Sequence, residues 1–286
     1  MSLQEHRLGP RPSSAGSTLP VRVELLRQLR RRRTQVTLGL AVVLPFILWI
    51  AFSVGRSSPP GQAGVSLTDL AQTSGPNFTA FALFSSASFL FVVLVALFFG
   101  DTVASEASWS SLRYLLAIPV PRVRLLRQKV VVAGILSVAA LVVLPLVSLA
   151  LGTLVYGDGP YNSPSGETLP YGTAVLRLLL CVVYLALYLA WVAGVSTLLS
   201  VSTDAPLGAV GGAVLISILS QILDSIDALG SIRDALPTHY AFAWSDLLTA
   251  DVDATDVVRG VLAGLVWATA FGATAVWWFR RKDITS

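Results

Sequence analysis

The sequence contains very few of the residues that hold metals or form disulfides. It has one cysteine, Cys181, and two histidines, His6 and His239, which lie far apart in the chain. A single thiol cannot form an internal disulfide, and zinc sites need several Cys or His ligands close together. We therefore expect neither a disulfide nor a metal site.

Common hydrolytic motifs are also absent. The chain has no GxxxxGKS/T phosphate-binding loop, no HExxH metalloprotease motif and no GxSxG nucleophile motif. Neither Lys129 nor Lys282 follows a glycine-rich loop. We therefore expect that this chain is not an enzyme, that it binds no cofactor of its own and that it has no nucleic-acid partner.

Charge is scarce as well. Charged residues make up 13% of the 286 residues, against about 25% in an average soluble domain, while 54% are hydrophobic and the mean hydropathy is +0.72. Apolar runs long enough to cross a bilayer recur along the chain. The pattern predicts an all-α membrane bundle of six transmembrane helices, at about residues 34–54, 79–99, 130–155, 173–200, 206–223 and 259–279.

The middle of each of these six runs lacks charged residues. The charged residues closest to the runs, Asp101, Arg177 and Arg259, all lie near run ends. Ion-coupled carriers usually bury charges at mid-depth, so this absence argues against a secondary carrier. It also leaves no acid–base pair for a membrane enzyme.

The basic residues predict the orientation of the bundle. Sixteen of the 20 Lys and Arg residues fall in the N-terminal segment, the 100–129 loop and the C-terminal segment. The other four are Arg56, Arg177, Arg233 and Arg259. The positive-inside rule therefore predicts a multi-pass membrane protein with both termini in the cytoplasm.

The N-terminal region divides into two parts. Residues 1–19 are rich in Pro, Ser and Gly and are predicted to be disordered. Residues 20–33 are predicted to form an amphipathic helix on the membrane surface, with Val21, Leu25 and Leu29 on its apolar side. The alternative is a simple basic anchor for the first span.

The 100–129 loop contains a second amphipathic run, which extends from Ser105 to Ile118 and stops at Pro119. On a helical period, Trp109, Leu112 and Leu115 share one side. We therefore expect a helix that lies along a surface at the cytoplasmic face.

Residues 224–258 form an unusual external segment, which is half apolar and carries seven aspartates. Pro237 interrupts it, and Tyr240 and Trp244 suit a membrane interface. We expect two short helices that dip into the outer leaflet or cap the bundle; the alternative is an ordinary folded loop.

Glycines four residues apart occur in the last two spans. Gly260 and Gly264 in the sixth span are interpreted as packing within the chain, and Gly208 and Gly212 in the fifth as a contact between subunits.

The order of these parts resembles the membrane subunits of ABC exporters of the ABC-2 type. The cytoplasmic loop reads Glu106, then WSSLR at 109–113, then LL at 115–116, PVPR at 119–122 and Lys129, and it is similar to the E…GT-L-R…LL…P-V-x-R…K pattern of that family. Ser110-Ser111 departs from the usual Gly-Thr. The resemblance covers nearly the whole chain.

The resemblance implies a permease domain over residues 34–286, located in a bacterial plasma membrane and surrounded by its lipids. It implies a homodimer or heterodimer with a second permease copy, bound to two P-loop ATPase subunits that hold the ATP and Mg²⁺. The cargo would be a hydrophobic or amphiphilic drug, lipid or peptide, as in multidrug efflux. A non-transporting accessory or immunity membrane protein is the alternative, and a secondary carrier is another.

The resemblance also implies roles for particular residues. Those expected to couple the chain to its ATPase are Glu106, Trp109, Leu112, Arg113, Leu115, Pro119 and Arg122. Those expected at the dimer interface are Gly208 and Gly212. Those expected at the external gate are Pro237, Tyr240 and Trp244.

Overall fold

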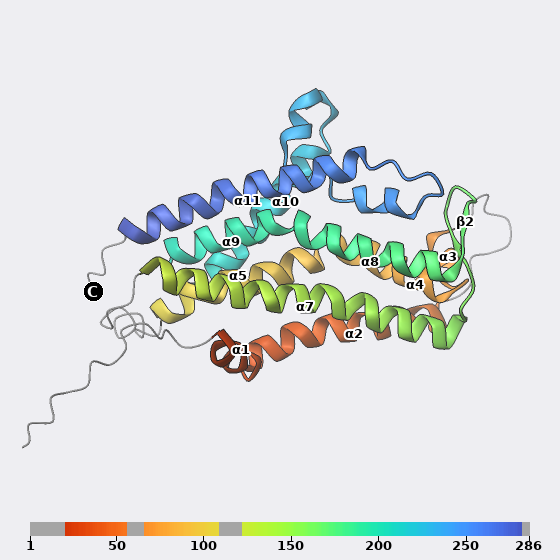
Figure 1. Ribbon diagram of the computed structural model, residues 1–286, viewed down its shortest axis with the longest axis horizontal. Coiled ribbons are helices and arrows are strands. Elements are labelled where there is room, and N and C mark those ends of the chain that lie inside the picture. Colours follow the sequence, from red (N-terminus) through yellow and green to blue (C-terminus); the bar gives the residue numbers. More distant parts are fainter. Residues whose placement is uncertain (1–20, 56–65, 109–121, 282–286) are drawn as a thin grey trace, which may run out of the picture.

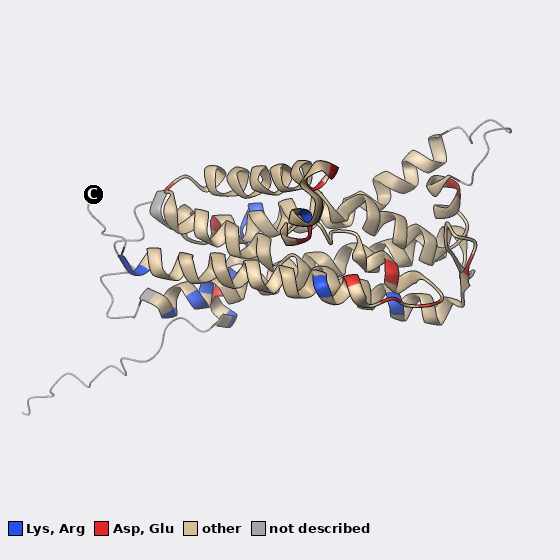
Figure 2. Ribbon diagram, turned by 90° about the horizontal axis from the view of Figure 1, so that it is seen from above, with Lys and Arg blue, Asp and Glu red and all other residues tan. Residues whose placement is uncertain are grey.

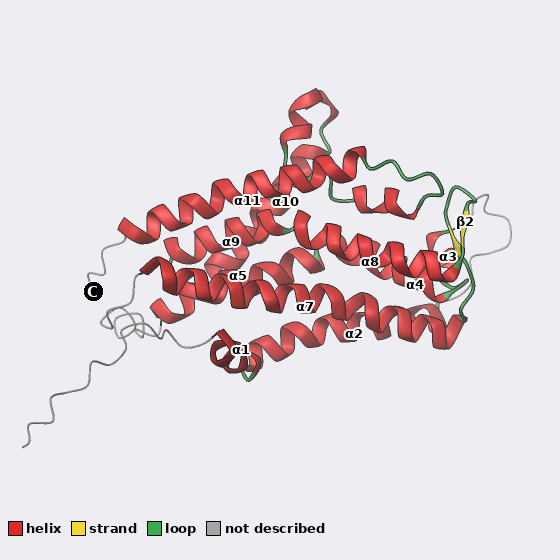
Figure 3. Ribbon diagram, in the orientation of Figure 1, coloured by secondary structure: helices red, strands yellow, loops and turns green. Residues whose placement is uncertain are grey.

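A computed structural model describes residues 21–55, 66–108 and 122–281. The helices are α1 (Val21–Leu29), α2 (Arg32–Val54), α3 (Leu67–Ala71), α4 (Gly75–Ala87), α5 (Leu90–Ser108), α7 (Arg122–Tyr156), α8 (Tyr171–Tyr188), α9 (Ala190–Ser202), α10 (Pro206–Asp224) and α11 (Thr255–Arg281). The 3₁₀ helices are η1 (Asp227–Ala235) and η2 (Ala243–Leu248), and the strands are β1 (Tyr161–Asn162) and β2 (Thr168–Leu169). The long helices run side by side in one elongated bundle (Figures 1 and 3).

The all-α membrane architecture is confirmed. Within the described residues, five helical segments are long and apolar enough to cross a membrane, with α8 and α9 counted as one, and the bent pair α4–α5 makes a sixth. The expected and observed spans differ mainly at their ends. α7 begins at Arg122, eight residues before the apolar run, and α5 continues to Ser108, so both helices extend into the range expected for the 100–129 loop.

The second span, which was expected at about residues 79–99, is a bent pair of helices. α4 and α5 meet at an angle of 56° around residues 88–89. The side-chain amide of Gln221 on α10 donates a hydrogen bond of 3.0 Å to the carbonyl of Ser88, which the bend leaves without a helical partner. The bend is therefore stabilised by a distant helix.

The centre of the bundle is α9, which contacts α5, α10 and α11. Trp191 and Val192 on α9 are fully buried. By contrast, α2 and α10 expose most of their apolar side chains and α11 exposes about half, as helices that face lipid or another subunit do.

The two ends of the bundle differ in charge. One end, here called the basic end, contains α1, the start of α2 and α7, and the end of α5 and α11, and most of the Lys and Arg residues lie there (Figures 1 and 2). The opposite end, the hairpin end, contains the antiparallel pair β1–β2, in which Tyr161 pairs with Leu169.

The segment between α10 and α11 contains the 3₁₀ segments η1 and η2, where two short helices were expected, and η1 is broken by a kink at Gly230, whose φ is 52°. η1, drawn in light blue, stands out from the side of the bundle (Figure 1). The indole nitrogen of Trp267 donates a hydrogen bond of 2.9 Å to the carbonyl of Ala235. Trp267 lies about 18 Å along α11 from the first residue of that helix, at 1.5 Å per residue, so the end of η1 is at mid-bundle depth.

Candidate functional site

A cavity of about 450 Å³ opens at the basic end between α2, α5, α7 and α10. Its wall is apolar, and its rim is polar. The apolar lining is Val36, Leu40, Leu97, Phe98, Val132, Ala133, Leu136, Pro206, Leu207 and Val210. The polar lining is Gln28, Arg32, Arg33, Thr34, Thr37, Asp101, Thr102 and Lys129. Such a cavity suits an amphiphile, with its apolar part along the helices and its polar part at the rim.

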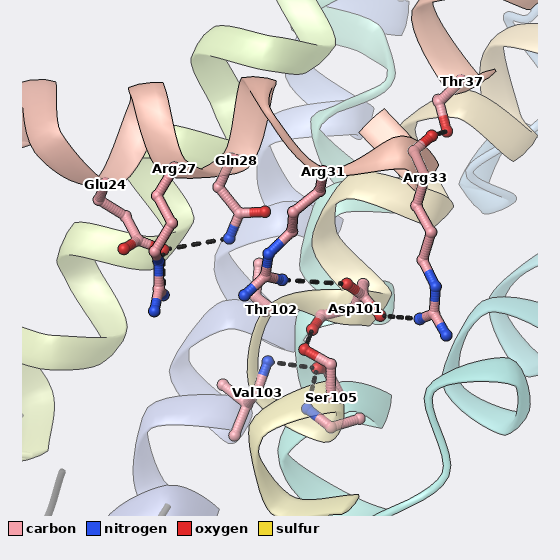
Figure 4. Close-up of polar contacts among 12 residues, drawn as sticks. Glu24, Arg27, Gln28, Arg31, Arg33, Thr37, Asp101, Thr102, Val103 and Ser105 are labelled. Carbon is pink, nitrogen blue, oxygen red and sulfur yellow. Dashed lines mark hydrogen bonds and ion pairs between the residues drawn. The ribbon is translucent and has the colours of Figure 1, made fainter. Parts of the chain in front are cut away.

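Asp101 on α5 is the acidic centre of this rim (Figure 4). Its carboxylate lies 2.9 Å from a guanidinium nitrogen of Arg33 and 3.6 Å from one of Arg31. Both arginines lie at the start of α2, where the helix dipole disfavours positive charge and the first turn carries no acidic residue. Asp101 therefore supplies the negative charge that this helix start lacks, and it joins α2 to α5.

A second ion pair, between Glu24 and Arg27, lies within α1, the helix that packs against α7. Glu24 is 5% exposed, and its carboxylate accepts hydrogen bonds from Arg27 at 2.8 Å and Gln28 at 3.1 Å (Figure 4). Burial alone would raise the pKa of the Glu24 carboxyl, but the Arg27 hydrogen bond and the charges of Lys129 and Arg27 outweigh it and hold the pKa below its ordinary value. Glu24 is therefore ionised at neutral pH.

Glu24 lies on the polar side of α1, opposite the apolar side that was expected to rest on the membrane surface. The structure turns that polar side towards the bundle and leaves Val21, Leu26 and Leu29 37–48% exposed. The helix is also shorter than residues 20–33, because it ends at Leu29 and Arg32 already belongs to α2.

The last turns of α5 are held by α9 and α10. Ser200 Oγ on α9 accepts hydrogen bonds from the backbone amides of Val103 and Ala104, at 3.0 and 3.1 Å. Gly100 allows close approach of α10, because a β-carbon there would lie 2.8 Å from Val210 Cγ2 and 3.2 Å from its backbone nitrogen. The end of α5 is thus packed directly on two neighbouring helices.

At the other end of the molecule, one face of α8 holds the segment between α10 and α11. Arg177, Cys181 and Tyr184 follow one another at spacings of four and three residues, which places them on the same side of the helix. Each donates a hydrogen bond to a backbone carbonyl of the segment. The acceptors are Leu247 and Thr249 for Arg177, Trp244 for Cys181 and Tyr240 for Tyr184.

A family model described as "ABC-2 family transporter protein" matches residues 24–284, which is nearly the whole chain. The chain belongs to the ABC-2 transporter family. No curated protein sequence matches it significantly. Members of this family are membrane transport components and are not themselves catalytic, in agreement with the expectation that this chain is not an enzyme.

Most of the coupling residues expected from the ABC-2 pattern lie outside the described residues. These are Trp109, Leu112, Arg113, Leu115 and Pro119. Glu106 belongs to the last turn of α5, and Arg122 is the first residue of α7. Both flanking helix ends lie at the basic end of the bundle (Figure 1).

The expected interface glycines of this ABC-2 chain differ in their surroundings. Gly208 is exposed, whereas a β-carbon at Gly212 would lie 3.0 Å from Leu199 on α9, so Gly212 packs within the chain. In α11 the within-chain interpretation is confirmed, because a β-carbon at Gly264 would lie 2.7 Å from the carbonyl oxygen of Tyr188.

The expected gate residues of the ABC-2 chain are all buried. Trp244 is 2% exposed and Tyr240 9%, and Pro237 is buried in the turn that precedes them. Sequence reasoning missed their partners on α8, although the spacing of Arg177, Cys181 and Tyr184 is a detectable signal. It also missed the pairing of Asp101 with α2, for which the sequence offers no local signal.

Proposed function

We propose that this chain is the membrane-spanning permease subunit of an ATP-driven ABC exporter in a bacterial plasma membrane. The observation that carries the proposal is the ABC-2 family match over residues 24–284. The full sequence has no phosphate-binding loop, so ATP and Mg²⁺ would be held by two separate P-loop ATPase subunits. The basic end would face the cytoplasm, with both termini, because it carries most of the positive charge.

Coupling to the ATPase would pass through residues 109–121 into α5 and α7. α5 is a continuous helix from Leu90 to Ser108. Near its end it is bonded to Ser200 on α9 and packed at Gly100 on α10. A displacement of the 109–121 segment by ATPase closure would therefore move α5, and α9 and α10 with it. Such a shift requires a partner that binds one conformation of the permease more tightly than the other, and the ATPase dimer would be that partner.

The substrate path would begin at the cavity of the basic end. α2 and α10 both line this cavity and both expose apolar side chains along their length. A second permease copy that packed against these two helices would enclose the cavity between subunits. An amphiphilic or hydrophobic cargo would suit its apolar wall and polar rim.

The test is co-purification of the chain with its candidate ATPase, followed by ATP hydrolysis and transport in lipid vesicles. Leu112→Asp places a charge on the apolar side of the predicted coupling helix, and Ser111→Asp places the same charge on its polar side as a matched control. Leu112→Asp should abolish transport and uncouple ATP hydrolysis from it, whereas Ser111→Asp should transport normally with hydrolysis still coupled.

Two results would contradict the proposal. If the chain purifies without any ATPase and has no effect on hydrolysis, it is an accessory membrane protein. If Leu112→Asp transports as well as Ser111→Asp, the coupling contact lies elsewhere.

A further inference from the structure

A second pocket lies at the hairpin end, far from the cavity of the basic end. It has a volume of about 390 Å³, within the range of roughly 300–1,000 Å³ that is typical of small-molecule sites. α3, α4, the β1–β2 hairpin and η2 enclose it. The ATPase-coupling elements contribute no residue to its described lining.

Four aromatic side chains contribute to the wall of this pocket. Phe81, Phe84, Tyr161 and Trp244 all line it. Phe84 is 44% exposed and packs on Phe242 at 4.9 Å and on Trp244 at 6.4 Å between ring centroids. Aromatic faces carry negative quadrupole potential, so a wall of this kind attracts cations as well as apolar groups.

Asp246 contributes a negative charge to the pocket. Among the described residues that line the pocket, it has the only carboxylate, and it forms no ion pair within the described part of the chain. Tyr161 stays neutral, because burial, and to a smaller extent Cys181, raises the pKa of its phenol to about 12. The pocket therefore combines one negative charge with several aromatic faces.

The surroundings of Asp246 increase its need for a positive partner. Burial and the charges of Asp256 and Asp253 raise the pKa of the Asp246 carboxyl, although Ser245 offers it a hydrogen bond. Asp253 remains negative, since hydrogen bonds from Thr255 hold its pKa below the ordinary value. The nearest basic residue on α8, Arg177, is directed to the carbonyls of Leu247 and Thr249. A bound cation would relieve the repulsion that Asp246 experiences.

We propose that the pocket at the hairpin end binds a lipophilic organic cation, such as a quaternary ammonium or phosphonium ion with aromatic substituents. Phe81, Phe84 and Trp244 contact its substituents, and Asp246 neutralises its charge. The proposal does not depend on the permease role, because every residue that carries it lies at the hairpin end, away from the residues expected to couple the chain to an ATPase.

Two ions of the same shape and opposite charge provide the test. Tetraphenylphosphonium and tetraphenylborate are titrated by equilibrium dialysis into the full-length chain in detergent, with protein-free micelles subtracted. The wild-type chain should bind the cation at least about tenfold more tightly than the anion. Asp246→Asn should lose about tenfold in cation affinity, whereas Asp251→Asn, an exposed aspartate outside the pocket lining, should not.

A second variant covers the case in which Asp246→Asn does not fold. Phe84→Leu keeps an apolar side chain at this exposed position but removes the aromatic face, and it should weaken cation binding several-fold. Equal affinity of the wild-type chain for the two ions would overturn the proposal. Unchanged cation affinity in folded Asp246→Asn, or in Phe84→Leu, would overturn it as well.

Discussion

Glycine-to-alanine substitutions in α11 offer a direct test of the packing described above. At Gly264 a β-carbon would lie 2.7 Å from the carbonyl oxygen of Tyr188 and 3.1 Å from its Cα. Both atoms are backbone, so α11 would have to move away by roughly 0.8 Å to reach the separation of about 3.5 Å at which heavy atoms attract. At Gly272 on the same helix, no atom lies within 4 Å of the added carbon.

The magnitudes follow from this difference. Alanine is favoured over glycine in a helix by roughly 0.5–1 kcal/mol, and this term is the same at both positions. Overpacking costs about 1–3 kcal/mol and applies only at Gly264. Gly264→Ala should therefore be less stable than Gly272→Ala by about 1–3 kcal/mol. At about 2–4 °C per kcal/mol for a large domain, the two variants should melt about 2–12 °C apart.

The chain contains its own reporter for this assay. Cys181 is the only cysteine in the sequence and is 0% exposed. A thiol-reactive fluorescent dye therefore reports unfolding around α8, which is the helix that α11 contacts through Gly264. If Gly264→Ala melted at or above the temperature of Gly272→Ala, the close approach of α11 to Tyr188 would be refuted.

Three other substitutions should have defined effects. Tyr184→Phe removes the hydroxyl that donates a hydrogen bond to the Tyr240 carbonyl. The variant should be less stable by about 1–3 kcal/mol, and backbone hydrogen exchange at residues 238–244 should be faster. Unchanged exchange at these residues would contradict the hydrogen bond. Because the pKa of Glu24 lies below its ordinary value of 4.5, its stabilisation is present above pH 4.5 and is lost as the pH falls through the lowered value. Glu24→Gln should therefore weaken the hydrogen-exchange protection of α1 at pH 7 by about 1 kcal/mol, after allowance for solvent screening. The difference from the wild-type chain should shrink as the pH falls below 4.5. A difference that did not change with pH would argue against a stabilising role for the Glu24 carboxylate. Gly100→Ala should cost about 1–3 kcal/mol, measured as a lower melting temperature, because its β-carbon would meet Val210 at 2.8 Å; an unchanged melting temperature would count against this contact.

The sequence predicts the spans well because each is a long apolar run that only a membrane helix can accommodate. It predicts the breaks within them poorly. Pro45 and Pro145 lie inside α2 and α7, and both helices continue through them. The bend between α4 and α5 has no proline or glycine at residues 88–90. Its Ser88 carbonyl accepts a hydrogen bond from Gln221, which lies 133 residues away, and local sequence signals do not reveal such a partner.

The polar contacts of the candidate site were likewise only partly predictable from the sequence. Asp101 was recognisable as a charge at a span end, but its partners Arg31 and Arg33 lie about 70 residues earlier, and only the packed bundle brings them together. Arg177, Cys181 and Tyr184 could have been found, because their spacing alone places three donors on one helical face. The coupling role stays a prediction for all seven residues: Glu106, Trp109, Leu112, Arg113, Leu115, Pro119 and Arg122.

The segment between α10 and α11 consists of two parts that are held very differently. η2 is anchored by Trp244 and Leu248, which are 2% and 3% exposed. η1 has no buried residue, and Ile232 on it is 64% exposed. Local stability follows buried apolar contact, so η1 should open at much lower free energy than η2. If this segment is the external gate, its moving part is therefore η1. Pro237, Tyr240 and Trp244 then belong to the fixed part of the segment. They are buried, and the carbonyls of Tyr240 and Trp244 accept hydrogen bonds from α8, so these residues would stay in place while η1 moves.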